Sequence, residues 1–122
     1  MAKTIMIVDD SASFRQVVGL TLRGAGYGVI EACDGQDALN KLNGQRVHLI
    51  ISDVNMPIMD GLTFLKSVKA NAAHKFTPVI MLTTESQQAK MMEGKAAGAK
   101  AWVTKPFQPP QILDAVSRLV LP

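Results

Sequence analysis

The sequence predicts an α/β protein with a doubly wound parallel sheet of five strands and five helices. Five short runs rich in apolar and β-branched residues alternate with segments of helical spacing, which is typical of an open parallel sheet covered by helices on both faces. The first, third and fourth runs are almost continuously apolar, which favours strands buried on both sides. The chain has 122 residues, 48% of them hydrophobic and 19% charged, so we expect one globular domain over residues 1–122.

The elements can be assigned in order along the chain. We expect strands at residues 4–8, 28–32, 47–52, 78–82 and 100–103. The first helix has Ser11 or Ser13 as a possible cap, and Gly24 and Gly26 favour its end. Its predicted apolar stripe consists of Phe14, Val17, Val18, Thr21 and Ala25.

Four further helices follow the later strands. Asp34 can cap the second, which Gly44 would end, and the third comes after Asp60 and Gly61. The fourth is expected over residues 86–97, and the fifth begins near Pro109-Pro110, where proline is tolerated in a first turn. Their predicted stripes are Ala38, Leu39 and Leu42; Leu62, Leu65 and Val68; Ala89, Met92 and Ala96; and Ile112, Leu113, Val116, Leu119 and Val120.

Polar residues stand directly after four of the predicted strands. Asp9 and Asp10 follow the first, Asp53 the third, Thr83 the fourth and Lys105 the fifth. In a doubly wound sheet, function gathers beyond the carboxyl ends of the strands. We therefore expect three carboxylates, a hydroxyl and an ammonium group to converge at one edge of the sheet.

Three carboxylates in a small site repel one another unless a cation accompanies them. Mg²⁺ takes oxygen ligands and keeps waters that phosphate oxygens can replace. The charges of Mg²⁺ and Lys105 together would balance the negative charge of the three carboxylates. Asp53 could then attack phosphorus to form an acyl phosphate, with Thr83 donating its hydroxyl to a phosphoryl oxygen. Taken singly, each residue is an ordinary cap, turn residue or solvated lysine; their joint placement is what favours a site.

These residues resemble the receiver domains of response regulators, and the likeness covers essentially the whole chain. Within that family the chain is most similar to the free-standing chemotaxis regulators. The resemblance implies a flavodoxin-like fold with strand order 2-1-3-4-5. Only 17 residues follow Lys105, enough for one helix, so no output domain is expected. The segments that carry the resemblance are Ile5-Met6-Ile7-Val8-Asp9-Asp10, Ile50-Ile51-Ser52-Asp53-Val54-Asn55-Met56-Pro57, Met59-Asp60-Gly61, Leu82-Thr83-Thr84-Glu85 and Lys105-Pro106-Phe107.

The resemblance also implies a role for each site residue. Asp53 would be the phosphoacceptor. Asp10 and Asp53 would ligate Mg²⁺ directly, Asp9 would act through a water, and Asn55 would contribute its backbone carbonyl. Asn55 and Glu85 would tune the hydrolysis of the acyl phosphate.

Further residues would bind the phosphate and transmit the signal. The resemblance implies that Lys105 pairs with the phosphoryl group, that the Lys105–Pro106 peptide bond is cis, and that Thr83 draws its loop inward. Trp102 occupies the place of an aromatic switch; an equally good interpretation is that the indole covers the edge of the sheet, because it is large and its N–H needs a partner when buried. A partner face would then comprise Lys90, Met91, Lys95, Lys100 and Trp102, or these residues form an ordinary solvated surface.

The expected function is that of a stand-alone phosphorylation switch, not an enzyme beyond its own phosphorylation and dephosphorylation. A CheA-like histidine kinase would phosphorylate Asp53, and the target would be a flagellar motor switch protein or another phospho-dependent partner. An alternative is a phosphorelay intermediate that passes phosphate to a histidine phosphotransfer protein. An aspartate-based phosphatase would need a second acidic residue, the general acid, two positions after the nucleophile, and that position is Asn55 here. A scaffold that acts without phosphate is disfavoured because the full set of phosphorylation-site residues is present.

Composition excludes other classes of function. The net charge is +3 with a pI of about 9.2, but the cations are scattered along the sequence, so nucleic-acid binding is not expected. No signal peptide or apolar run long enough to span a membrane is seen. The single cysteine, Cys33, fits a reducing compartment. We therefore expect a cytoplasmic monomer.

Overall fold

A computed structural model of the protein describes residues 3–54, 56–84, 89–105 and 108–120, with backbone only at 89–91 and 94. Strands and helices alternate throughout these residues. The elements are β1 (Thr4–Val8), α1 (Ala12–Gly24), β2 (Gly28–Ala32), α2 (Gly35–Leu42), β3 (Leu49–Asp53), α3 (Gly61–Ala70), β4 (Val79–Thr84), α4 (Ala89–Ala97), β5 (Ala101–Lys105) and α5 (Pro109–Leu119).

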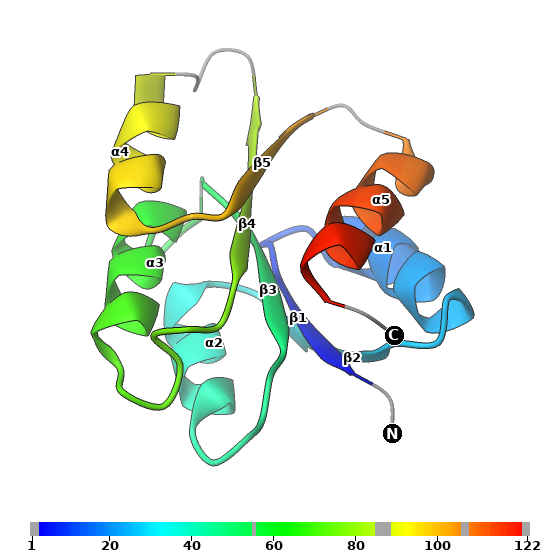
Figure 1. Ribbon diagram of the computed structural model, residues 1–122, viewed down its shortest axis with the longest axis horizontal. Helices are drawn as coiled ribbons and strands as arrows, with labels where there is room; N and C mark the ends of the chain where they lie inside the picture. Colours follow the sequence, from blue (N-terminus) through cyan, green and yellow to red (C-terminus); the bar gives the residue numbers. More distant parts are fainter. Residues whose placement is uncertain (1–2, 55, 85–88, 106–107, 121–122) are drawn as a thin grey trace.

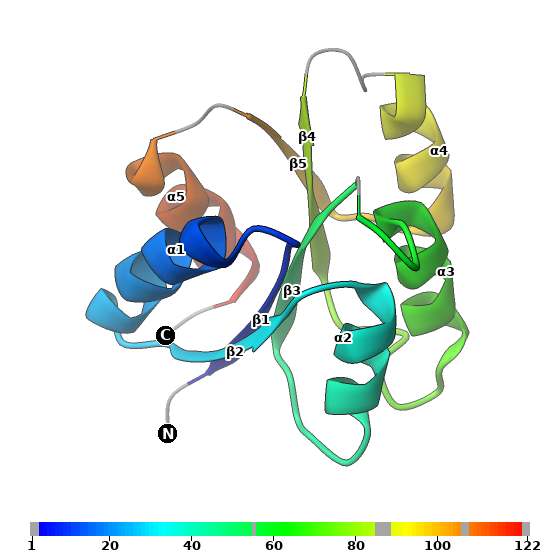
Figure 2. The same cartoon turned by 180° about the vertical axis from the view of Figure 1, so that it is seen from behind.

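The strands form one parallel sheet in the order β2-β1-β3-β4-β5. Helices α1 and α5 cover one face, and α2, α3 and α4 cover the other (Figures 1 and 2). The predicted fold class and strand order are therefore confirmed. The first two strands match their predicted limits, whereas β3, β4 and β5 begin and end one or two residues later than predicted.

The core consists of two hydrophobic clusters separated by the sheet. Alternate residues of the central strands point to opposite faces. Ile50 and Met81 belong to the cluster beneath α2 and α3, whereas Ile51 and Leu82 belong to the cluster beneath α1 and α5. Strand β3 is buried along its whole length, as the continuous apolar runs predicted.

The predicted stripe of α1 is confirmed only in part, and that of α4 is wrong at Met92. In α1 the buried residues are Val18, Gly19 and Leu22, while Val17 is 55% exposed. In α4, Met92 is 81% exposed. In α1, Val18 of the predicted stripe is buried and Phe14 packs against the same cluster. Val17 lies outside it, because neighbouring apolar residues allow more than one stripe. The stripes of α3 and α5 are confirmed at Leu62, Leu65, Val68, Ile112 and Val116.

Side-chain caps fix where the first three helices begin; those at Ser11 and Asp34 were predicted, whereas Asp60 was not predicted as a cap. The side chains of Ser11, Asp34 and Asp60 accept backbone N–H groups at the starts of α1, α2 and α3. Helices α1 and α2 therefore start within four residues of the carboxyl end of the preceding strand, whereas α3 starts eight residues after the end of β3. None of the helices in the described part of the chain is long and apolar enough to cross a membrane.

Candidate functional site

The carboxyl ends of the central strands bring three carboxylates together. Asp9 and Asp10 directly follow β1, and Asp53 is the last residue of β3. Carboxylate oxygens of these three residues lie within 4.8 Å of one another. Because β1 and β3 are neighbours in the sheet, residues that are more than 40 positions apart along the chain meet at this edge.

Lys105, the last residue of β5, supplies the positive charge of the site. Its Nζ lies 3.0 Å from Asp9 Oδ2 and 3.4 Å from Asp53 Oδ2. The same ammonium lies 4.3 Å from the centre of the Phe14 ring, a favourable cation–π distance. The lysine side chain is therefore held over the carboxylates rather than extended into solvent.

The carboxylates differ in burial. Asp9 is 1% exposed and Asp53 8% exposed, whereas Asp10 is exposed. The backbone N–H of Ser11 donates to Asp9 Oδ1 at 2.9 Å, and Arg15 donates to the Asp9 carbonyl. A buried carboxylate is costly unless it is paired and hydrogen-bonded, so Asp9 is a fixed part of the site while Asp10 faces water.

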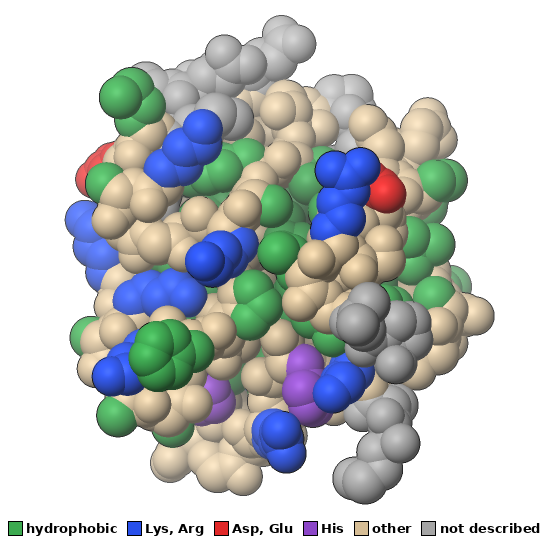
Figure 3. Space-filling view, viewed as in Figure 1, with side chains coloured by type: hydrophobic (Ala, Val, Ile, Leu, Met, Phe, Trp, Pro, Cys, Tyr) green, Lys and Arg blue, Asp and Glu red, His purple; other side chains and the backbone are tan. Residues whose placement is uncertain are grey.

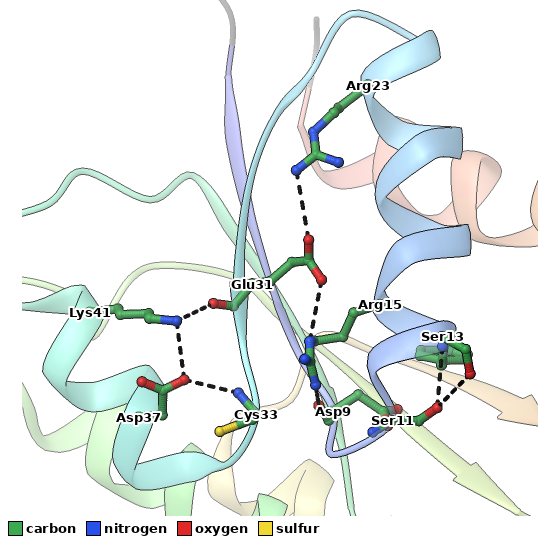
Figure 4. Close-up of polar contacts among 10 residues, drawn as sticks. Asp9, Ser11, Ser13, Arg15, Arg23, Glu31, Cys33, Asp37 and Lys41 are labelled. Carbon is green, nitrogen blue, oxygen red and sulfur yellow. Dashed lines mark hydrogen bonds and ion pairs between the residues drawn. The ribbon is translucent and has the colours of Figure 1, made fainter.

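Arg15 belongs to a wider polar network beside the site. Its Nε lies 3.3 Å from Glu31, which also approaches Arg23 at 3.8 Å (Figure 4). Glu31 lies in β2, the strand next to β1. The network therefore ties the start of α1 to the sheet and fixes the loop that carries Asp9.

Perturbed pKa values occur next to this network. The Cys33 backbone N–H donates to Asp37 Oδ2 and Lys41 lies beside it, and these contacts lower the pKa of Asp37. Burial and the neighbouring carboxylate of Asp37 raise the pKa of the Cys33 thiol. Since the thiolate is the reactive form of cysteine, this environment makes Cys33 a poor nucleophile.

Thr83 is fully buried near the end of β4, and its hydroxyl donates to the Thr84 carbonyl at 3.2 Å. In the sheet register, Thr83 pairs with Thr104 and Met81 pairs with Trp102. Paired residues point to the same face, so Thr83 and Trp102 share the face covered by α3 and α4. The two predicted switch residues are thus diagonal neighbours on adjacent strands.

The Trp102 indole packs against the core, but its ring nitrogen has no hydrogen-bond partner within the described part of the chain. The ring contacts the cluster beneath α2 and α3, and Nε1 is buried without a hydrogen-bond acceptor among the described residues. A buried, unsatisfied N–H costs free energy. The indole thus packs against the core in this conformation while its N–H stays unsatisfied by the described residues, which is the conflict that its size and polar group led us to expect.

The loop between β3 and α3 approaches Asp53 closely. A Cβ added at Gly61 would lie 2.1 Å from the Asp53 carbonyl oxygen and 2.8 Å from Val54 Cα, and the Gly61 N–H donates to the Val54 carbonyl at 2.9 Å. Only glycine permits this approach. Ile58 in the same loop has a φ of 69°, which is unusual for a β-branched residue.

Several predicted residues cannot be placed. Asn55, Glu85 and the Lys105–Pro106 peptide bond lie outside the described residues, as do the side chains of Lys90 and Met91. Lys95 and Lys100 are exposed, as a partner face requires.

Phe14, Arg15 and Gly61 were not predicted as site residues, because an apolar stripe, a single arginine and a loop glycine give no distinct signal.

The donor set fits a hard divalent cation. Its members are oxygen ligands of the kind that Mg²⁺ prefers, on a cluster with an exposed side at Asp10. Lys105 balances only part of the charge of the three carboxylates. The acidic cluster could therefore bind Mg²⁺.

Comparison with known proteins identifies the family to which the chain belongs. The family model of the response regulator receiver domain matches residues 5–117. The chain belongs to this family. The structure is similar to that of the chemotaxis response regulator CheY4 of Vibrio cholerae, with a TM-score of 0.92 and 48% identity, covering 98% of this chain and 100% of that one.

Other receiver domains extend the comparison. Chemotaxis protein CheY1 of Helicobacter pylori is 37% identical over 119 residues, 96% of this chain and 95% of the relative. The receiver domain of the sensor histidine kinase PA1611 from Pseudomonas aeruginosa has a TM-score of 0.88 and 26% identity, covers 98% of each chain, and holds a magnesium ion in its active site cleft. The predicted family and its likeness to chemotaxis regulators are therefore confirmed.

Proposed function

We propose that this receiver domain is a stand-alone switch that accepts a phosphoryl group on Asp53 from a histidine kinase in a Mg²⁺-dependent reaction. The observation that carries the proposal is the contact of one ammonium group, Lys105 Nζ, with both Asp9 and Asp53. If Asp53 is the acceptor, this cation would lie where negative charge develops on the transferred phosphoryl group.

Asp53 is suited to act as the nucleophile. An Asp53 carboxylate oxygen would attack phosphorus, the P–N bond of the donor phosphohistidine would break, and its electron pair would return to the imidazole nitrogen. The Lys105 ammonium would stabilise the equatorial oxygens during transfer, and Thr83 would afterwards turn its hydroxyl from the Thr84 carbonyl to a phosphoryl oxygen.

Asp10 and Asp53 would hold Mg²⁺ directly, Asp9 through water, and Asn55 through its backbone carbonyl. When bound, the ion neutralises carboxylate charge and polarises phosphoryl oxygens. Asn55 and Glu85 would set the rate of hydrolysis. The exposed side of the cluster at Asp10 leaves room for this binding.

A hollow beside Lys105 offers a path for the donor. It has a volume of about 570 Å³ and is lined by Phe14 and Val17 of α1, Thr84, Lys105 and Ile112 of α5, among others. Its mainly apolar wall ends at the ammonium group that contacts Asp53. A histidine-bearing helix seated there would bring its phosphoryl group to the carboxylates.

Phosphorylation would be reported through Thr83 and Trp102. Replacing a carboxylate by an acyl phosphate adds negative charge and biases a two-state loop. Because the two residues are neighbours on one face of the sheet, movement of Thr83 would change the space available to the indole. The α4–β5–α5 surface, with Lys90, Met91, Lys95, Lys100 and Trp102, would then gain or lose affinity for a target.

The relatives indicate which pathway this switch would serve. The names of CheY1 and CheY4 state a role in chemotaxis, so we favour a CheA-like kinase and a flagellar motor switch protein as cytoplasmic partners. A phosphorelay role would use the same acceptor, but no observation on the described residues favours it.

The test is intact-mass measurement after incubation with acetyl phosphate, with and without Mg²⁺. One added phosphoryl group is expected only when Mg²⁺ is present, and none in Asp53→Asn. Asp114→Asn is the matched control, because Asp114 is an exposed carboxylate on α5 that pairs with Arg118. Phosphorylation of Asp53→Asn to the level of the control would contradict the proposal.

A further inference from the structure

At the end of the molecule opposite the site, the described connections between helices and strands carry no carboxylate side chain. No Asp or Glu occurs in the connections that lead into the strands at this end, which are residues 25–27, 43–48, 71–78 and 98–100. They contain Arg46, Lys75 and Lys100. In Figure 3, the lower part of the visible face carries basic and histidine side chains and no acidic ones. Cations that are scattered along the sequence are thus gathered by the fold.

The cations at this end are not balanced by ion pairs. Arg15, Arg23, Lys41, Lys66, Lys105 and Arg118 each lie near a carboxylate, whereas no ion pair of Arg46, Lys75 or Lys100 occurs among the described residues. Burial, Lys3 and Arg46 together lower the pKa of His48. Burial and Lys100 lower the pKa of Lys69. In both groups burial is the main cause of the lowered pKa, and the neighbouring cations add to it.

A hollow of about 560 Å³ lies within this positive region. We call it the basic hollow; it is formed by the 43–48 and 73–78 segments, and its lining includes Arg46, Val47, His48, His74, Phe76 and Thr77. Phe76 is 85% exposed, and Lys75 Nζ lies 5.0 Å from its ring centre. An exposed aromatic ring beside a cation is a feature of binding surfaces rather than of ordinary solvated loops.

The walls of the basic hollow are held in place from within. Lys69 Nζ donates to the carbonyls of Lys75 and Thr77, and the His74 ring pairs with the Leu42 carbonyl at 3.2 Å. His48 Nδ1 accepts the Thr4 N–H at 3.0 Å, so in the neutral ring the other nitrogen is a donor. A pre-organised hollow loses little entropy on binding.

We propose that the basic hollow binds an acidic peptide segment of a partner protein. Carboxylates of the peptide would pair with Arg46 and Lys75, and an apolar side chain of the peptide would pack on Phe76. Charge complementarity is the main argument, since the described connections at this end offer cations and N–H donors without a carboxylate side chain. The concave shape favours a peptide over a flat lipid surface, and a single aromatic ring is too few for a base-stacking platform.

This interaction is independent of the phosphoacceptor site. The basic hollow lies at the amino ends of the strands, whereas Asp53 and Lys105 lie at their carboxyl ends. A partner could therefore hold the protein without covering Asp53. The inference goes beyond the proposed function and stands whether or not Asp53 accepts phosphate.

The experiment uses the full chain and a labelled twelve-residue peptide with six Glu and two Leu among Gly and Ser. Fluorescence anisotropy at low and moderate salt measures affinity, and amide shifts in nuclear magnetic resonance spectra locate the site. A matched peptide has Gln in place of Glu. The test variants are Arg46→Glu/Lys75→Glu and Phe76→Ser, all at exposed positions, and the control with the same net charge is Lys95→Glu/Arg118→Glu.

We expect the acidic peptide to bind, to weaken about tenfold or more in Arg46→Glu/Lys75→Glu, and to change less than about twofold in the control. Amide shifts should fall in residues 43–48 and 71–78, and the Gln peptide should not bind. Equal weakening in both double variants, shifts on α4 and β5 instead, or absence of binding would overturn the proposal. So would binding to phosphatidylserine vesicles without binding to the peptide.

Discussion

Lys105 Nζ lies 3.0 Å from Asp9 Oδ2, although the two residues are 96 positions apart in the sequence. Both stand at carboxyl ends of parallel strands, with β3 and β4 between them in the sheet. The lysine therefore spans the acidic cluster and contacts both Asp9 and Asp53. Its charge stabilises the buried carboxylates, and it would compete with a divalent cation bound to the same oxygens.

Replacing Lys105 by methionine tests this dual role. Without metal, Lys105→Met should destabilise the fold by about 2–3 kcal/mol, because buried carboxylates lose their partner. Mg²⁺ should bind roughly tenfold more tightly, because a competing positive charge is removed. Thermal melts with and without Mg²⁺, together with calorimetric titration, measure both effects. With Lys95→Met as the control, equal or weaker Mg²⁺ binding in Lys105→Met would contradict the competition.

Gly61 should tolerate no side chain. In Gly61→Ala the new Cβ would meet the Asp53 carbonyl and Val54 Cα, so the β3–α3 loop must move, at a cost of about 3 kcal/mol. Urea denaturation gives the change in unfolding free energy. Gly24→Ala is the matched control, since nothing lies within 4 Å of its added Cβ, and it should leave stability unchanged or raise it slightly. A similar result for both variants would refute the close approach.

The sequence predicted the sheet and the composition of the site better than the details around it. Continuous apolar runs and strand-end polar residues identify β1, β3 and β4 and their Asp and Thr side chains without knowledge of any contact. The orientation of α1 could not be predicted in the same way, because Val17 and Val18 both satisfy helical spacing. The cation–π contact of Phe14 with Lys105 depends on how α1 packs against β5, which only the tertiary structure determines.

Ile58 should be strained in its present conformation. Its φ of 69° is in the left-handed region, which costs a β-branched residue about 1–2 kcal/mol, and its side chain is 83% exposed. Ile58→Gly should therefore raise the unfolding free energy by roughly 1 kcal/mol. Ile58→Val keeps the branched Cβ and should change little. Destabilisation by glycine in urea melts would mean that the side chain makes a contact the fold needs.

Trp102 should be replaceable by a smaller ring without loss of stability. Trp102→Phe removes an N–H that has no acceptor among the described residues, and this gain of about 1 kcal/mol or more offsets the lost apolar contact. Trp102→Ala removes the ring from the core cluster and should cost about 3 kcal/mol. Chemical denaturation compares the two variants. A loss in Trp102→Phe as large as in Trp102→Ala would show that the indole N–H has an acceptor.

Asp37 should make the free energy of unfolding of the protein depend on pH. The Cys33 N–H, 3.0 Å from Asp37 Oδ2, is the main cause of the lowered pKa, with Lys41 at 3.1 Å as a further one (Figure 4). A carboxyl whose pKa is lower in the folded than in the unfolded state stabilises the fold above the unfolded value of 3.8. That stabilisation is lost as the pH falls through the folded value.

At neutral pH, Asp37→Asn should therefore be less stable than the parent protein by about 1 kcal/mol, and the difference should vanish in strong acid. Urea melts from neutral pH down to the acid limit of folding test this dependence. Asp114→Asn, which alters an exposed pair on α5, should show no such convergence. A difference for Asp37→Asn that stays constant across the pH range would show that the carboxylate charge is not what the Cys33 N–H and Lys41 stabilise.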